Sequence, residues 1–190
     1  MKILGIVGSP RKGGNTEILV EEALSATREA GAQTEVILLA DKNIAGCDGC
    51  NSCFETGVCK IKDDMQGIYQ QLEAADAIIF GSPVYFGGVT AQAKALIDRT
   101  YLYLRDRRLK GKVVAPIVAL RRVGGGQTRT LLYGYFIAQG MIVTRGAIGY
   151  GRQKGEVREG VGGTQDFSAL EEARNAGKEV FQMLQRISRA

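Results

Sequence analysis

The chain of 190 residues contains no histidine. That absence excludes Ser-His-Asp and Cys-His hydrolysis and metal sites of the H-E-x-x-H type, because each needs an imidazole. The reactive groups of any catalysis must then be lysine, tyrosine, aspartate or glutamate side chains, or belong to a bound cofactor or metal cluster. Hydride and electron transfer fit this restriction, since their reactive atoms belong to the cofactor.

The chain also lacks any apolar run long enough to span a membrane. Residues 1–7 lead directly into a short apolar strand and do not resemble a signal peptide, so we expect a cytoplasmic protein without permanent disulfides. The net charge of +5 is scattered except at Arg105–Lys112, which we interpret as a solvated helix end. We therefore expect neither a nucleic-acid nor a membrane partner, and one domain over residues 1–190.

Cysteine occurs in one short segment and nowhere else. The spacing is C-x2-C-x2-C-x5-C, formed by Cys47, Cys50, Cys53 and Cys59 within a cysteine-rich loop at 46–60. A [4Fe–4S] cluster offers one iron to each of four thiolates, and two-residue gaps let successive cysteines reach adjacent corners. The spacing favours such a cluster.

Three other interpretations of the cysteines stay open. Structural zinc also takes four cysteines, although usually as two pairs separated by a longer stretch. Disulfides would require an oxidising compartment. The loop could also bind nothing, as the remnant of a cluster site.

Apolar strand-like runs alternate with segments of helical periodicity along the chain. Strands are predicted at 2–8, 35–39, 76–81, 112–120 and 141–148, and helices at 16–30, 63–74, 90–104, 128–139 and 166–186. This alternation predicts an α/β fold with a doubly wound, five-stranded parallel sheet of flavodoxin-like order 2-1-3-4-5. A ligand is expected at the carboxyl edge, and the glycine-rich stretch 149–163 is predicted to be a mobile loop.

The first predicted strand leads into a loop suited to an anion. Its polar groups and turn glycine are Ser9, Arg11, Gly13, Asn15 and Thr16, ahead of a helix N-terminus. The loop is neither a Walker A motif nor G-x-G-x-x-G, so a monophosphate suits it better than ATP. The alternative is a simple helix cap by Asn15 or Thr16.

Two further loops are expected at the same edge. After the third strand, Pro83, Val84, Tyr85, Phe86 and Gly87 can offer backbone groups and an apolar surface to a planar ring. After the fourth, Arg121 precedes the glycines Gly124, Gly125 and Gly126, which permit a ligand to approach the backbone. The convergence of three loops favours a ligand site over three unrelated turns.

Three segments together resemble the NADPH-dependent FMN reductase superfamily, over roughly residues 1–145. They are residues 8–16 (GSPRKGGNT), 47–53 (CDGCNSC) and 81–88 (GSPVYFGG), and the four cysteines resemble the iron–sulfur flavoprotein branch. The resemblance implies bound FMN, a [4Fe–4S] cluster, and dimers or tetramers. It implies that Ser9, Arg11, Asn15 and Thr16 hold the phosphate, and that the 83–87 and 124–126 loops hold the isoalloxazine.

On this basis we predict an FMN-dependent oxidoreductase that passes electrons between a reduced donor, a [4Fe–4S] cluster and FMN. The donor is NAD(P)H or a ferredoxin-like carrier, since no dedicated NADPH fingerprint is visible. Backbone N–H groups at 124–126, or Arg121, could stabilise negative charge on reduced flavin. A reductase of FMN or quinone without a functional cluster, and a non-catalytic redox carrier or sensor, are the alternatives.

Two predictions concern the surroundings of the flavin. The aromatic runs 85–86 and 101–103 are expected to be exposed, so that a neighbouring subunit partly covers the flavin edge. The alternative is that these residues fill the core of the monomer. The cysteine loop is expected to lie close to the flavin, because the second strand ends at the same edge as the first.

Overall fold

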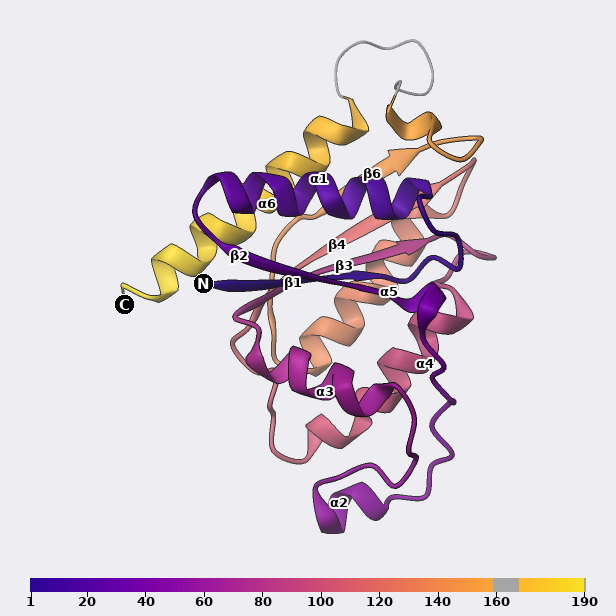
Figure 1. The fold of residues 1–190 in the computed structure, drawn as a ribbon, viewed down its shortest axis with the longest axis vertical. Helices are drawn as coiled ribbons and strands as arrows, with labels where there is room; N and C mark the ends of the chain where they lie inside the picture. Colours follow the sequence, from indigo (N-terminus) through magenta and orange to yellow (C-terminus); the bar gives the residue numbers. More distant parts are fainter. Residues whose placement is uncertain (159–167, 190) are drawn as a thin grey trace.

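The computed structural model describes residues 1–158 and 168–189, which contain a parallel sheet between two layers of helices (Figure 1). The strands are β1 (Lys2–Val7), β2 (Gln33–Leu38), β3 (Ala77–Pro83), β4 (Val113–Leu120), β5 (Ile142–Val143) and β6 (Ala147–Tyr150). Their order is β2-β1-β3-β4-β5, with β6 also paired to β4, and every pairing is parallel. The predicted α/β fold and its 2-1-3-4-5 order are confirmed.

Helices cover both faces of this sheet (Figure 1). On one face lie α1 (Asn15–Glu29) and α6 (Ala169–Ile187), and on the other lie α3 (Met65–Ala74), α4 (Ala91–Arg99) and α5 (Gly125–Ala138). The short α2 (Ser52–Thr56) belongs to the cysteine loop, and 3₁₀ turns occur at Leu39–Asp41, Thr100–Leu104 and Glu156–Arg158. Alternate residues of β1 face opposite layers: Leu4 and Ile6 pack toward α3, α4 and α5, whereas Ile3 and Val7 pack toward α1 and α6.

The predicted fifth strand is divided in two, and Pro116 of β4 explains the break. Even-numbered residues of β4 face the segment that contains β5 and β6, and their carbonyls accept hydrogen bonds from it. Val114 accepts from Thr144 N–H and Leu120 from Gly151 N–H, both at 2.9 Å. Pro116 faces the same way but has no N–H to donate. Val114 and Ile117 are three residues apart on β4, but their partners Val143 and Ala147 are four residues apart. The segment between β5 and β6 therefore contains one extra residue, which forms a bulge.

Some predicted helix boundaries need correction. The helix predicted at 90–104 is α4 followed by the 3₁₀ turn Thr100–Leu104, and Thr90 caps α4 by accepting from Ala93 N–H at 3.1 Å. The start predicted for the last helix, Asp166, lies outside the described residues, as does 159–163 of the predicted mobile loop. None of the helices that the structure describes is long and apolar enough to cross a membrane.

The aromatic run 101–103 is not the exposed patch that was predicted. Leu102 and Tyr103 are buried in the core, and only Tyr101 reaches the surface, where it packs against Phe54 with 4.9 Å between ring centroids. Tyr85 and Phe86, by contrast, are exposed.

Candidate functional site

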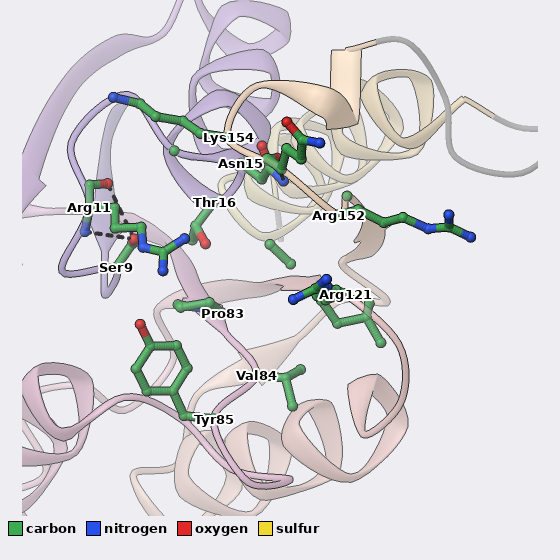
Figure 2. A pocket seen from close by; sticks show the side chains of 15 residues that line it. Ser9, Arg11, Asn15, Thr16, Pro83, Val84, Tyr85, Arg121, Arg152 and Lys154 are labelled. Atoms are coloured by element: carbon green, nitrogen blue, oxygen red, sulfur yellow. Dashed lines mark hydrogen bonds between the residues drawn. The ribbon is translucent and has the colours of Figure 1, made fainter.

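A pocket of about 250 Å³ lies at the carboxyl edge of the sheet, between the loops after β1, β3, β4 and β6 (Figure 2). Eight of the predicted site residues line it: Ser9, Arg11, Asn15, Thr16, Pro83, Val84, Tyr85 and Arg121. The predicted residues Gly13, Phe86, Gly87, Gly124, Gly125 and Gly126 lie outside this lining. The volume is close to the lower end for ligand pockets, about 300 Å³.

The loop after β1 shapes an anion-binding corner. The Ser9 hydroxyl accepts from Arg11 N–H at 3.0 Å and lies 3.2 Å from the Arg11 carbonyl, so it closes the turn that places the guanidinium (Figure 2). Gly14 precedes α1 without a side-chain cap, so the predicted alternative of a cap by Asn15 or Thr16 is wrong. First-turn N–H groups of a helix are then available to an anion.

One donor of this loop is already engaged. Gly13 N–H donates to the Glu17 carboxylate at 2.6 Å, which explains why Gly13 does not face the pocket. Thr16 is 2 % exposed, and its methyl group packs against Gly81 of β3. Its hydroxyl therefore points toward the pocket (Figure 2).

Asn15 joins the loop before α1 to residues 151–155. Its amide donates to the Gln153 carbonyl at 2.8 Å and accepts from Gly155 N–H at 2.7 Å. A β-carbon on Gly151 would lie 2.2 Å from the Asn15 amide nitrogen, so this contact requires glycine. Asn15 thus holds a pocket wall in place.

Sequence reasoning missed that wall. Gly151, Arg152, Gln153 and Lys154 line the pocket, together with Gly14, Ala119 and Leu120. Residues 151–154 lie over 130 residues from the first loop in the sequence, and the signal available was a basic run, Arg152-Gln153-Lys154, inside a glycine-rich stretch.

The loop after β3 ends in a tight hairpin turn. Tyr85 and Gly88 exchange backbone hydrogen bonds of 2.9 and 3.0 Å, and both central residues, Phe86 and Gly87, have positive φ. Phe86 at the tip is fully exposed and adopts φ 50°, which non-glycine residues rarely do. Val84 and Tyr85 remain to form the apolar side of the pocket.

Two of the three glycines after β4 have packing roles that the sequence did not predict. Gly124 has φ 94°, and a β-carbon there would lie 2.9 Å from a Val84 methyl group. It therefore lets the loops after β3 and β4 pack together. Gly125 packs against Leu120 and Ile148, and only Gly126 faces open space.

Three arginines surround a second hollow of about 420 Å³ beside the pocket. They are Arg121, Arg122 and Arg152, of which Arg121 and Arg152 also line the pocket. In Figure 2 the Arg121 guanidinium points into the pocket, whereas that of Arg152 points away from it. This concentration of positive charge favours anions at the pocket mouth.

The four cysteines line one cavity, as their spacing predicts, but it is small. Cys53 is buried, Cys59 is half-buried, Cys47 and Cys50 are exposed, and the space among them is about 20 Å³. In the part of the chain that the structure describes, no three cysteine or carboxylate side chains converge on a metal position. Burial raises the pKa of the Cys53 thiol, and the charges of the other three cysteines raise it further.

The cysteine loop is closed at its base by a buried ion pair. Arg99, the last residue of α4, is 2 % exposed, and its Nη1 lies 2.6 Å from Asp63 Oδ2. Burial alone would raise the pKa of Asp63, yet the Arg99 guanidinium and the N–H groups of Ala45 and Met65 hold it below its ordinary value. At the exposed rim, a hydrogen bond from Lys60 lowers the pKa of Asp48 to about 2.

The cysteine loop and the pocket do not share an edge within one chain, so that prediction is wrong. Thr90, before α4, bonds to the Gly8 carbonyl at the carboxyl edge, whereas Arg99 at the other end of α4 lines the cysteine cavity. Nine helical residues separate these ends by about 13 Å. Figure 1 shows the loop extending past α3 and α4, away from the N-terminal end of α1.

The chain is similar in sequence to known proteins. Residues 1–154 match the family described as NADPH-dependent FMN reductase. An iron-sulfur flavoprotein of Methanocaldococcus jannaschii is 41 % identical, with 100 % of both chains covered. An NAD(P)H dehydrogenase (quinone) of Archaeoglobus fulgidus is 33 % identical, over 68 % of this chain and 69 % of that relative.

A solved structure supports the fold independently. The flavodoxin, WrbA-like protein from Agrobacterium tumefaciens superimposes with a TM-score of 0.66, at 18 % identity and with 97 % of both chains covered. Since identity is this low, the likeness concerns the flavodoxin-like fold alone.

Proposed function

The chain belongs to the NADPH-dependent FMN reductase family, and from that premise we propose that it is an iron–sulfur flavoprotein passing electrons between a reduced donor, a [4Fe–4S] cluster and FMN. The coarser activity, that of an FMN-dependent oxidoreductase, is supported by the family and by relatives named as iron-sulfur flavoproteins. The observation that carries the proposal is the polar, cationic pocket at the carboxyl edge of the sheet.

The pocket residues fit FMN. Arg11, the Thr16 hydroxyl and the first-turn N–H groups of α1 would hold the phosphate, because a helix N-terminus and a guanidinium both favour a dianion. Val84 and Tyr85 would contact the isoalloxazine ring, and Arg121 would stabilise negative charge on it. When bound, FMN supplies hydride acceptance and one-electron release.

The cysteines fit a cluster by the chemistry of their donors. Four thiols around one cavity, with no histidine in the chain, would provide the all-sulfur ligand set that a [4Fe–4S] centre needs. A cavity of about 20 Å³ has room for little more than a water, so the loop must open for the cluster to bind. Cys47 and Cys50 are exposed, which leaves that side of the loop free to move outward.

We assign NAD(P)H as a donor on the basis of the arginine hollow. The cluster of Arg121, Arg122 and Arg152 adjoins the flavin pocket and suits the phosphates of a pyridine nucleotide. A ferredoxin-like carrier is the second donor in the proposal, since an acidic protein surface would be attracted to the same arginines.

We further propose that the chain forms a homodimer or homotetramer and acts in the cytoplasm. Phe86 is fully exposed on a constrained turn beside the pocket, and Tyr85 beside it is also exposed. Large aromatic side chains held in this way are typical of interfaces, so a second copy would cover the flavin edge.

The second candidate is an NAD(P)H-dependent FMN or quinone reductase without a cluster. The small cysteine cavity and the relative named NAD(P)H dehydrogenase (quinone) favour it. The two candidates share the flavin site and differ only in whether the cysteines bind iron.

Fluorescence titration of apoprotein with FMN tests the flavin site. Arg11→Gln should weaken FMN binding about 10- to 100-fold, because a hydrogen bond to a charged group contributes about 1.5–3 kcal/mol. Lys12→Gln is the matched control, since Lys12 pairs with Asp41 and does not line the pocket. Equal FMN affinity in folded Arg11→Gln and wild type would refute the assigned phosphate site.

A further inference from the structure

Arg99 connects the core to both ends of the cysteine loop. Its Nη1 donates to the Ala45 carbonyl at 3.0 Å, and its Nη2 donates to the Ile61 carbonyl at 3.2 Å. Ala45 lies two residues before Cys47, and Ile61 lies two residues after Cys59. One guanidinium therefore fixes the distance between the two ends of the ligand loop.

The third nitrogen of this guanidinium has no protein partner. Arg99 Nε is buried and makes no hydrogen bond within the described residues, although both Nη groups contact Asp63 at 2.6 and 3.2 Å. Leaving a buried donor unpaired is unfavourable, and more so when the donor belongs to a charged group. An ion pair that served only to support the loop would not require this unpaired donor.

The Arg99 side chain lines the same cavity as the four thiols. Four thiolates on a dicationic iron–sulfur core carry net negative charge, and one-electron reduction adds to it. The Arg99 guanidinium is paired with Asp63, yet it lines this cavity and keeps one N–H without a partner among the described residues. A positive group with a free donor at this place would stabilise the more negative, reduced form to a greater degree.

We propose that Arg99 is a positioning residue for the cluster, with its Nη groups setting the loop and its Nε–H and charge raising the reduction potential. This inference rests on the cluster in the proposed function. The electron in question comes from dithionite in the test below, and the cluster takes up one electron without breaking a ligand bond. Hydrogen bonds to sulfur and local charge are established determinants of such potentials.

The test compares Arg99→Gln and Arg99→Lys with wild type after anaerobic reconstitution with iron and sulfide. Arg108→Gln is the matched control, because Arg108 donates to the Gly57 carbonyl of the same loop at 2.9 Å but does not line the cavity. Iron content, circular dichroism and a dithionite titration followed by electron paramagnetic resonance are measured for each protein.

At a fixed applied potential, Arg99→Gln should lower the ratio of reduced to oxidised cluster at least about tenfold. That change corresponds to a reduction potential about 59 mV lower for a one-electron couple. Arg99→Lys keeps the charge but lacks the Nε–H, so a smaller shift in the same direction is expected, and Arg108→Gln should match wild type. If Arg99→Gln assembles no cluster, the shift in reduction potential of Arg99→Lys tests the proposal instead.

An unshifted potential in iron-loaded Arg99→Lys, or in iron-loaded Arg99→Gln, would overturn the role of Arg99. An equal shift in Arg108→Gln would also overturn it, since any loop arginine would then have the same effect. Wild type that binds no iron would refute the proposed function itself, which separates the two failures.

Discussion

The pocket at the carboxyl edge and the cysteine loop are built in opposite ways. The pocket takes its residues from four loops whose ends are fixed by hydrogen-bonded strands, so the sheet holds it together. The cysteine loop lies outside the sheet, with two of its thiols exposed, and a buried ion pair anchors its base. The first site depends on the fold, and the second on a few side chains.

This difference teaches that the two sites can fail separately. A change in the cysteine loop should leave the strand ends, and hence the flavin loops, undisturbed. A change at the pocket should likewise leave the Arg99–Asp63 pair and the thiols in place. The predictions below test this independence, from the largest expected effect to the smallest.

Cys53→Ala should abolish the intact cluster while FMN binding stays within about twofold of wild type. Loss of one thiolate leaves a three-iron or empty site, and the flavin loops contain no cysteine. Iron and flavin are assayed per chain after anaerobic reconstitution. A parallel loss of FMN would show that the two sites are coupled.

Asp63→Asn should reduce the free energy of unfolding by about 3–5 kcal/mol, because it leaves the Arg99 charge buried without its partner. Urea denaturation measures the change. Asp98→Asn is the control, since the exposed Lys94–Asp98 pair contributes about 1 kcal/mol or less. Equal destabilisation by the two substitutions would contradict the role given to the buried pair.

The Asp63 carboxylate also determines in which direction stability changes with pH. The pKa of Asp63 is lower in the folded chain than its ordinary value, which is about 3.9 in an unfolded chain. Its contribution is therefore fully present above about pH 4 and is lost as the pH falls through the lower, folded value. Asp63→Asn should flatten this part of the acid-unfolding profile, and an unchanged profile would contradict it.

Arg122→Gln should raise the KM for NADPH about 1.4- to fivefold without changing FMN affinity. Arg122 lines the arginine hollow but not the pocket, and an exposed charge contributes about 0.2–1 kcal/mol. The effect should shrink as salt is added, because added ions screen exposed charges. Arg129→Gln on α5, outside the hollow, is the control, and an equal rise there would remove the hollow from the donor site.

The strand order and the loops around the pocket could be predicted because apolar periodicity and the carboxyl-edge rule determine them. The split of the fifth strand depends on Pro116 in the neighbouring strand, which cannot donate a backbone hydrogen bond, and the sequence of the fifth strand itself does not show this. The wall at 151–154 reaches the pocket through Asn15, a contact between distant segments.

Arg99 could not be identified from the sequence, because it looks like any charged residue at the end of an amphipathic helix. Its burial follows from the way the cysteine loop folds over the end of α4, which only the structure shows. The same packing takes the cysteines away from the edge where the order of strands had predicted them.

The most direct test of the central claim is the cofactor content of the wild-type protein. The chain is reconstituted anaerobically with iron, sulfide and FMN, and iron, acid-labile sulfide, zinc and flavin are quantified per chain. We predict about four irons, about four sulfides and about one FMN, with no zinc. Stoichiometric FMN together with zinc, or with no metal at the four cysteines, would contradict the account and leave a flavin reductase without a cluster.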